Sequence, residues 1–188
     1  MQCFRLCSIR KRAPFRRGNP GRSGDANRKR VTTSTKRRVI RVQPSELALG
    51  MKRVVRAPRS IVFRACTEPE ELARWWGPRG FTTPAIEIDL RVGGRYRFAM
   101  QPPAGDLFHL TGEFLEVDPP SRLVYTFVWE PPGPDDRETV VRLTFRGVDG
   151  STQVDFTPGV FATEARRALH EQGWTDSFER LGELLSGP

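Results

Sequence analysis

The chain has few of the residues on which common kinds of functional site depend. Its 188 residues include three cysteines, and this odd number without paired spacing argues against a disulfide framework and for a reducing compartment. The two histidines have no second ligand-type residue at metal-binding spacing, and there is no G-x-S-x-G motif for a nucleophilic serine. No apolar run approaches the ~20 residues of a membrane span or forms the core of a secretory signal. We therefore expect no metal, no cofactor and no membrane attachment.

Positive charge is abundant but unevenly distributed. The chain has a formal net charge of +9, yet residues 1–46 alone have a net charge of +12 and the remainder −3. Residues 1–46 contain scattered glycine and proline and few apolar residues, so we predict a basic, disordered extension before a domain at residues 47–185. Weak polyanion binding and a targeting role are alternatives for this segment, although its glycines would break the helix of a transit peptide. We expect no other nucleic-acid binding, because the domain is mildly acidic.

A strand and two short helices are expected at the start of the domain. Residues 47–57 predict a strand and residues 59–66 a short helix. Thr67 lies three residues before Glu70, which is the spacing of a capping box. This pattern predicts a second short helix through residues 71–76.

Six strands are expected next, because apolar and polar residues alternate along most of the chain that follows. In residues 86–92 and 96–100 the alternation is regular, and Gly93-Gly94 between them predicts a two-residue hairpin. The remaining strands are expected at residues 108–117, 123–129, 141–145 and around 154–156.

A long amphipathic helix is predicted for residues 164–185, with Thr163 as its N-cap. Its apolar face consists of Leu169, Trp174, Phe178, Leu181 and Leu185. The order of elements predicts an α+β fold in which this helix covers the concave face of a curved antiparallel sheet. One helix cannot fill the concavity of seven strands, so we expect a ligand cavity between helix and sheet. The predicted pocket residues are large and mostly aromatic, and a solid core is the alternative: Trp75, Trp76, Phe81, Phe98, Met100, Phe114, Tyr125, Phe127, Trp129, His170, Trp174 and Phe178.

Four segments of the chain resemble those of a known family. They are VVRAPRSIVFRACTEPEELARWWGP, IDLRVGGRYRF, VDPPSRLVYTF and QGWTDSFERL. They are similar to the bacterial START-like proteins called activator of heat-shock protein 90 ATPase homologue-like, of the SRPBCC superfamily, and residues 1–46 have no counterpart there. The resemblance implies the helix-grip fold, in which a bent sheet holds the C-terminal helix around an apolar cavity. It does not select an activity, since the superfamily includes lipid carriers, polyketide cyclases and chaperone cofactors.

Other polar residues have ordinary interpretations beside functional ones. His170 could face the pocket mouth as an acid or base near neutral pH, although a surface position on the helix is the simpler interpretation. His109 falls on a strand, and Cys66 is most simply a small buried apolar residue. Arg91, Arg95 and Arg97 alternate with apolar residues and predict a solvated sheet face, with anion binding as the alternative.

The leading functional interpretation is a non-catalytic binding protein. It would hold an apolar small molecule between sheet and helix, oriented by polar groups such as Tyr125 or His170. One alternative is an enzyme of the cyclase or hydrolase kind, which needs an inward-facing acid–base pair that the alternation does not supply. Another is a chaperone cofactor in the stress response, as the family name suggests, acting through an exposed surface. We expect a cytoplasmic monomer or homodimer.

Overall fold

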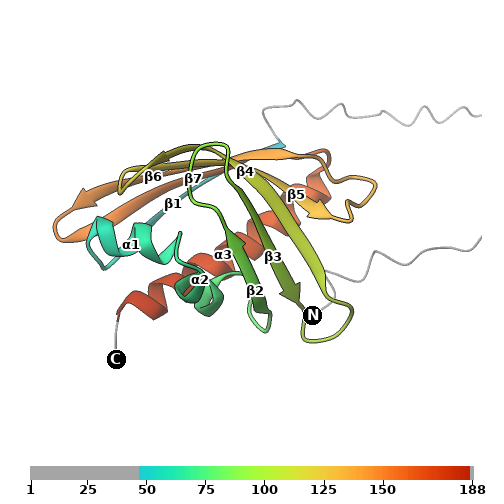
Figure 1. Ribbon diagram of the computed structural model, residues 1–188, viewed down its shortest axis with the longest axis horizontal. Coiled ribbons are helices and arrows are strands. Elements are labelled where there is room, and N and C mark those ends of the chain that lie inside the picture. The colour runs from blue at the N-terminus through green and yellow to red at the C-terminus, as the bar shows by residue number, and fades with distance from the viewer. Residues whose placement is uncertain (1–46, 187–188) are drawn as a thin grey trace, which may run out of the picture. The chain divides into compact units, whose positions relative to one another are not determined.

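The computed structural model describes residues 47–186, which form one antiparallel sheet and three helices (Figure 1). The extension predicted for residues 1–46 lies outside the described residues. In chain order the elements are β1 (Ala48–Val55), α1 (Arg59–Ala65), α2 (Pro69–Trp75), β2 (Thr82–Ile88), β3 (Arg95–Gln101), β4 (Phe108–Asp118), β5 (Arg122–Glu130), β6 (Thr139–Val148), β7 (Ser151–Val160) and α3 (Glu164–Ser186). Within residues 47–186 no helix is both long and apolar enough to cross a membrane.

The seven strands follow the order β1-β7-β6-β5-β4-β3-β2, and all neighbouring strands are antiparallel. Strands β2 to β7 are neighbours in sequence as well as in space, so short turns can connect them. Strand β1 pairs with β7 and completes the sheet at the opposite edge from β2. The α+β class and the order of elements predicted from the sequence are confirmed.

Helix α3 crosses the hollow side of the curved sheet, and α1 and α2 lie on that same side (Figure 1). Its buried residues are Trp174, Ser177, Phe178 and Leu181, whose spacing of three and four residues defines one helical face. The predicted N-cap is also present, because the backbone N–H of Arg166 donates to the Thr163 hydroxyl at 3.2 Å. The sequence of α3 therefore determines both its start and the face that it buries.

The predicted two-residue hairpin at Gly93-Gly94 is wrong. Strand β2 ends at Ile88, and residues 89–94 form a longer turn in which Val92 is 62% exposed. Gly93 has a φ of +78°, and its N–H donates to the Phe114 carbonyl at 2.8 Å. The Asp89 N–H still donates to the Arg95 carbonyl at 2.9 Å, and beyond it the turn bonds to β4, so the period-two alternation ends earlier than the sequence predicts.

The predicted capping box at Thr67 and Glu70 is also wrong. Helix α2 begins at Pro69, with Glu68 as its N-cap and no side-chain hydrogen bond there. The Thr67 hydroxyl instead donates backward to the Phe63 carbonyl at 3.0 Å, in the last turn of α1. Since α1 and α2 are separated by only three residues, the same threonine can serve either helix, and here it stabilises the first.

Candidate functional site

Two tryptophans from different helices meet at the centre of the interior. The rings of Trp76, just after α2, and Trp174, on α3, lie 4.9 Å apart at an interplanar angle of 90°. On the sheet side, Trp76 contacts Phe98 at 5.2 Å and Trp174 contacts Phe156 at 4.5 Å. Edge-to-face pairs of this kind are favourable beyond the area they bury. The α2 end and the middle of α3 are thus joined to strands β3 and β7 by one aromatic cluster.

A glycine on β4 allows a tyrosine to extend this aromatic interior. The Tyr96 hydroxyl donates to the Thr126 carbonyl on β5 at 2.7 Å, so its side chain reaches across the intervening strand β4. It does so over Gly112, where an added Cβ would lie 1.9 Å from the same carbonyl oxygen and 2.7 Å from the Tyr96 ring. Tyr96 then contacts Tyr125 at 5.4 Å. Burial raises the pKa of both tyrosines well above the usual value, so neither phenol ionises near neutral pH.

The interior ends in a small recess beside the first turns of α3. Its volume is about 10 Å³, which is about the room that one water molecule requires. Three aromatic residues, two from β5 and one directly after β7, form part of its wall: Phe127, Trp129 and Phe161. His170 on α3 completes that wall and contacts the Phe161 ring at 4.5 Å.

His170 is held in its neutral form. The indole N–H of Trp129 donates to its Nε2 at 3.3 Å, so Nε2 is an acceptor and the ring proton lies on Nδ1. Burial is the main cause that lowers the pKa of His170 from 6.5 to about 4, and the positive charge of Arg166 one turn earlier is the second cause. The sequence-based hypothesis of an acid or base titrating near neutral pH is therefore not supported by this environment.

An ion pair between helix and loop closes the same end of the interior. Arg166 on α3 pairs with Asp136 in loop 131–138, which connects β5 to β6, and the Asp136 side chain is 7% exposed. The other carboxylate oxygen of Asp136 accepts the backbone N–H of Gly133 at 2.7 Å. One carboxylate therefore shapes the loop and attaches it to α3 beside the recess. Removing Arg166 would leave the buried carboxylate of Asp136 without its ion-pair partner.

The twelve predicted pocket residues all lie in one connected interior. Ten of them are buried, and the other two, Trp129 and His170, are half-buried at the recess. Other residues that line or join this interior are not among those twelve, including Tyr96, Phe156, Phe161, Asp136 and Arg166. Phe156 and Arg166 had a signal in the sequence, since Phe156 alternates with Val154 and Arg166 lies one helical turn before His170.

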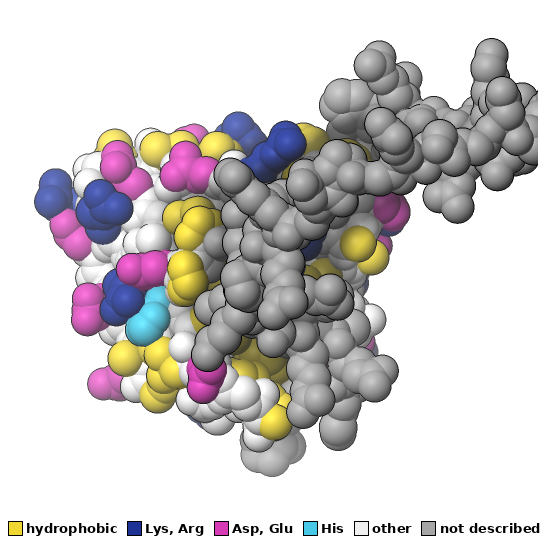
Figure 2. All heavy atoms as spheres, turned by 90° about the vertical axis from the view of Figure 1, so that its right-hand side faces the viewer, with side chains coloured by type: hydrophobic (Ala, Val, Ile, Leu, Met, Phe, Trp, Pro, Cys, Tyr) yellow, Lys and Arg dark blue, Asp and Glu magenta, His cyan; other side chains and the backbone are white. Residues whose placement is uncertain are grey.

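The remaining candidates lie outside this interior. Arg97 pairs with Glu130 at 2.8 Å in an open groove of about 360 Å³, where its charge is already matched. Burial raises the pKa of Cys66 to about 12, so its thiol is unreactive at neutral pH. Within residues 47–186 no group of three His, Cys, Asp or Glu side chains could hold a metal. In the view of Figure 2, basic and acidic side chains are interspersed on the visible part of the domain.

Comparisons with known proteins agree on one family. The model of a family described as Activator of Hsp90 ATPase homolog 1-like protein matches residues 56–186. Among solved structures, a protein from Nitrosomonas europaea is 31% identical, covering 76% of this chain and 96% of that one, with a TM-score of 0.64. A protein from Chromobacterium violaceum is 26% identical over 76% of this chain and 99% of that one, with a TM-score of 0.67. A Silicibacter pomeroyi protein described as AHSA1 is 25% identical over 74% and 97%, with a TM-score of 0.62. A search among curated proteins found no match.

Proposed function

The chain belongs to the family of Activator of Hsp90 ATPase homolog 1-like proteins, and we propose that its domain binds an apolar, partly aromatic small molecule without turning it over. The ligand would enter at the recess beside His170 and lie between α3 and strands β5 and β7. The observation that carries this proposal is the aromatic wall of the recess, which continues through Trp174 into the interior. Sites for small molecules are mostly apolar and have a few polar groups that fix orientation.

Binding requires the recess to enlarge, because about 10 Å³ cannot hold a molecule larger than water. Trp129 is the ring best placed to move, since it is half-buried and lies one residue before the end of β5. Its displacement would join the recess to the edge of Trp174 through Phe127, whose ring lies 6.2 Å from that of Trp174. An aromatic ligand would replace the ring contacts that Trp129 gives up, so the open form would be stabilised by ligand.

The polar groups at the recess are suited to orienting a bound ligand. Neutral His170 has its proton on Nδ1 and offers a donor, and the Trp129 indole N–H becomes a second donor when its ring moves. Both favour a ligand with a carbonyl, ether or phenolic oxygen. A histidine with a pKa of about 4 is a weak base at neutral pH and is almost never protonated, so it is poorly suited to general acid–base catalysis.

Binding can be tested with N-phenyl-1-naphthylamine, a neutral aromatic probe that fluoresces in apolar sites. We expect saturable binding that changes tryptophan emission and is less than twofold weaker in 0.5 M than in 0.05 M NaCl, because apolar burial is little screened. His170→Ala should weaken binding about tenfold, equivalent to ~1.4 kcal/mol, because the aromatic probe would lose its ring contact with the imidazole. His109→Ala is the matched control, since His109 on β4 lies outside the recess and should leave the affinity unchanged.

Three results would contradict the proposal. Absence of saturable binding would remove its basis, and equal losses in both histidine variants would place the probe elsewhere. Turnover of an ester or polyketide-like substrate, reduced about a hundredfold by His170→Ala, would indicate an enzyme instead. Native mass spectrometry of freshly purified protein would additionally reveal a small molecule that copurifies with the domain.

A further inference from the structure

Loop 77–80, between α2 and β2, lies next to the aromatic cluster of Trp76 and Trp174. It follows directly after Trp76, whose ring contacts both Phe98 and Trp174. Pro78 in this loop packs against α3 at Gly173, where an added Cβ would lie 3.6 Å from the proline ring. The loop therefore continues directly from one central tryptophan and packs at the residue that precedes the other.

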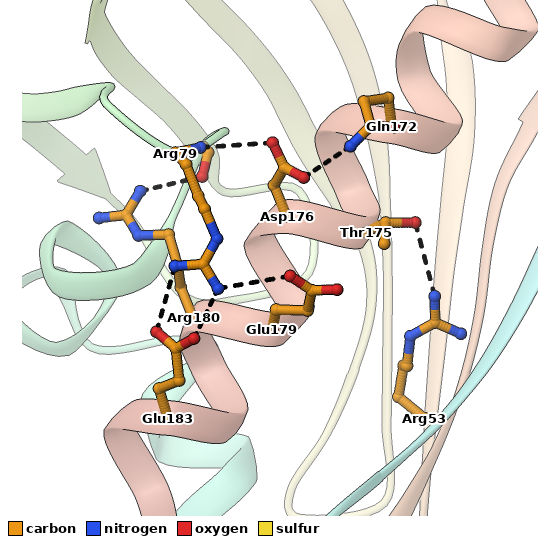
Figure 3. Close-up of polar contacts among 9 residues, drawn as sticks. Arg53, Arg79, Gln172, Thr175, Asp176, Glu179, Arg180 and Glu183 are labelled. Carbon is orange, nitrogen blue, oxygen red and sulfur yellow. Dashed lines mark hydrogen bonds and ion pairs between the residues drawn. The ribbon is translucent and has the colours of Figure 1, made fainter.

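Arg79 attaches this loop to the exposed side of α3 (Figure 3). Its guanidinium donates to Glu183 at 2.5 Å and to Glu179 at 3.3 Å, and its backbone N–H donates to Asp176 at 3.4 Å. The side chains of Arg79, Glu179 and Glu183 are all more than half exposed. Ion pairs between such exposed groups are individually weak and are screened by salt.

Arg180 reaches in the opposite direction, from α3 to the loop (Figure 3). Its guanidinium donates to the carbonyls of Trp76 at 3.2 Å, Gly77 at 2.9 Å and Pro78 at 3.3 Å. The same guanidinium donates to the Arg74 carbonyl in the last turn of α2 at 3.0 Å, so Arg180 bonds to carbonyls at the end of the helix and just beyond it. Loop and helix are thus held together by the exposed ion pairs of Arg79, by the partly buried hydrogen bonds of Arg180, and by the packing of Pro78 at Gly173.

The backbone of the loop provides two points at which it can turn. Gly77 has a φ of +91° and Gly80 a φ of +84°, a region that residues with a side chain rarely adopt. Between them lie only Pro78 and Arg79, so the two glycines bracket the residues that contact α3. A rotation at these glycines would lift Pro78 and Arg79 together without unwinding α2 or β2.

From these contacts we propose that loop 77–80 is a salt-sensitive latch over the aromatic interior, held closed by Arg79 and opened when its ion pairs are screened or lost. Release uncovers Trp76 and creates a second entrance to the interior. The part of this inference that concerns ligand entry rests on the proposed binding function. The opening of the loop does not, and it can be measured without any ligand.

The first experiment is hydrogen–deuterium exchange of the segment that contains the amides of Arg79 and Phe81. Arg79→Gln keeps a polar side chain and removes its charge, and it should accelerate exchange in this segment about fivefold. Raising NaCl from 0.05 to 1 M should accelerate exchange similarly in the unmodified protein and have little further effect in Arg79→Gln. Glu183→Gln should act in the same direction. Arg122→Gln is the control, because Arg122 forms an exposed ion pair with Glu116 within the sheet.

The second experiment measures the rate at which N-phenyl-1-naphthylamine associates, by stopped-flow fluorescence. Arg79→Gln and high salt should each increase this rate about fivefold, and Arg122→Gln should not. Unchanged exchange in Arg79→Gln, or an equal salt effect in that variant, would refute the latch. Faster exchange in Arg79→Gln with an unchanged association rate would refute the proposal that the opened loop creates a second entrance. Failure of the probe to bind any variant would refute the binding function, while the exchange experiment would still decide whether the latch exists.

Discussion

The environment of His170 predicts a specific dependence of stability on pH. The pKa of this residue is lowered from 6.5 to about 4 in the folded protein, chiefly by burial and secondly by Arg166. In the unfolded chain the imidazole takes up a proton near pH 6.5, whereas in the folded chain it stays neutral until near pH 4. The stabilisation is therefore fully present above pH 6.5 and is lost as pH falls from 6.5 towards 4.

The size of this stability loss follows from one proton, which the His170 imidazole binds in the unfolded chain but not in the folded chain between pH 6.5 and about 4. Between pH 6.5 and pH 5 the free energy of unfolding should fall by about 1.5 kcal/mol because of His170 alone. The neighbouring charges favour this sign: Arg166 disfavours a second positive charge, and Asp136, which would favour one, is already engaged by Arg166. Above pH 5 most carboxyl groups remain ionised, so the histidine contribution is separated from acid unfolding.

Urea unfolding at half-unit steps from pH 7 to pH 5, followed by tryptophan fluorescence, measures this loss. His170→Gln cannot titrate, so between pH 6.5 and pH 5 its stability should fall by about 1.5 kcal/mol less, whatever its stability at pH 7. His109→Gln controls for the second histidine and should retain the full slope. Equal slopes in the unmodified protein and in His170→Gln would refute the neutral, buried state of this residue.

Further predictions concern the core, the helix cap and the extension. Trp174→Ala should lower the free energy of unfolding by roughly 3–5 kcal/mol in chemical denaturation, and a loss below about 1 kcal/mol would mean that the indole lines a space that can collapse. Gly112→Ala should prevent normal folding, because its Cβ would meet the Thr126 carbonyl at 1.9 Å; a melting temperature near that of the parent would contradict the close approach of β4 and β5 there. Thr163→Ala should cost about 1 kcal/mol through loss of the N-cap, whereas Thr163→Ser should restore most of it. Removal of residues 1–46 should change the melting temperature by no more than a few degrees, and a larger drop in calorimetry would show that this segment packs on the domain.

Local patterns in the sequence specify the elements of this fold and most of its core. The alternation of apolar and polar residues located β3 to β7, and the spacing of Trp174, Phe178 and Leu181 identified the buried face of α3. These signals are local, because they depend on backbone geometry that repeats every two or about 3.6 residues. Where one residue could serve two neighbours, as Thr67 does between α1 and α2, the local pattern was insufficient.

How the interior is closed, and which polar groups meet there, depends on tertiary contacts between residues that are distant in sequence. The contact of Trp129 with His170 joins positions 41 residues apart, and the bonds from Arg180 to loop 77–80 span more than 100. No periodicity within an element encodes such pairs, since they depend on how α3 crosses the sheet. The same crossing removes His170 from water and keeps it neutral, which turns a candidate acid or base into part of an aromatic wall.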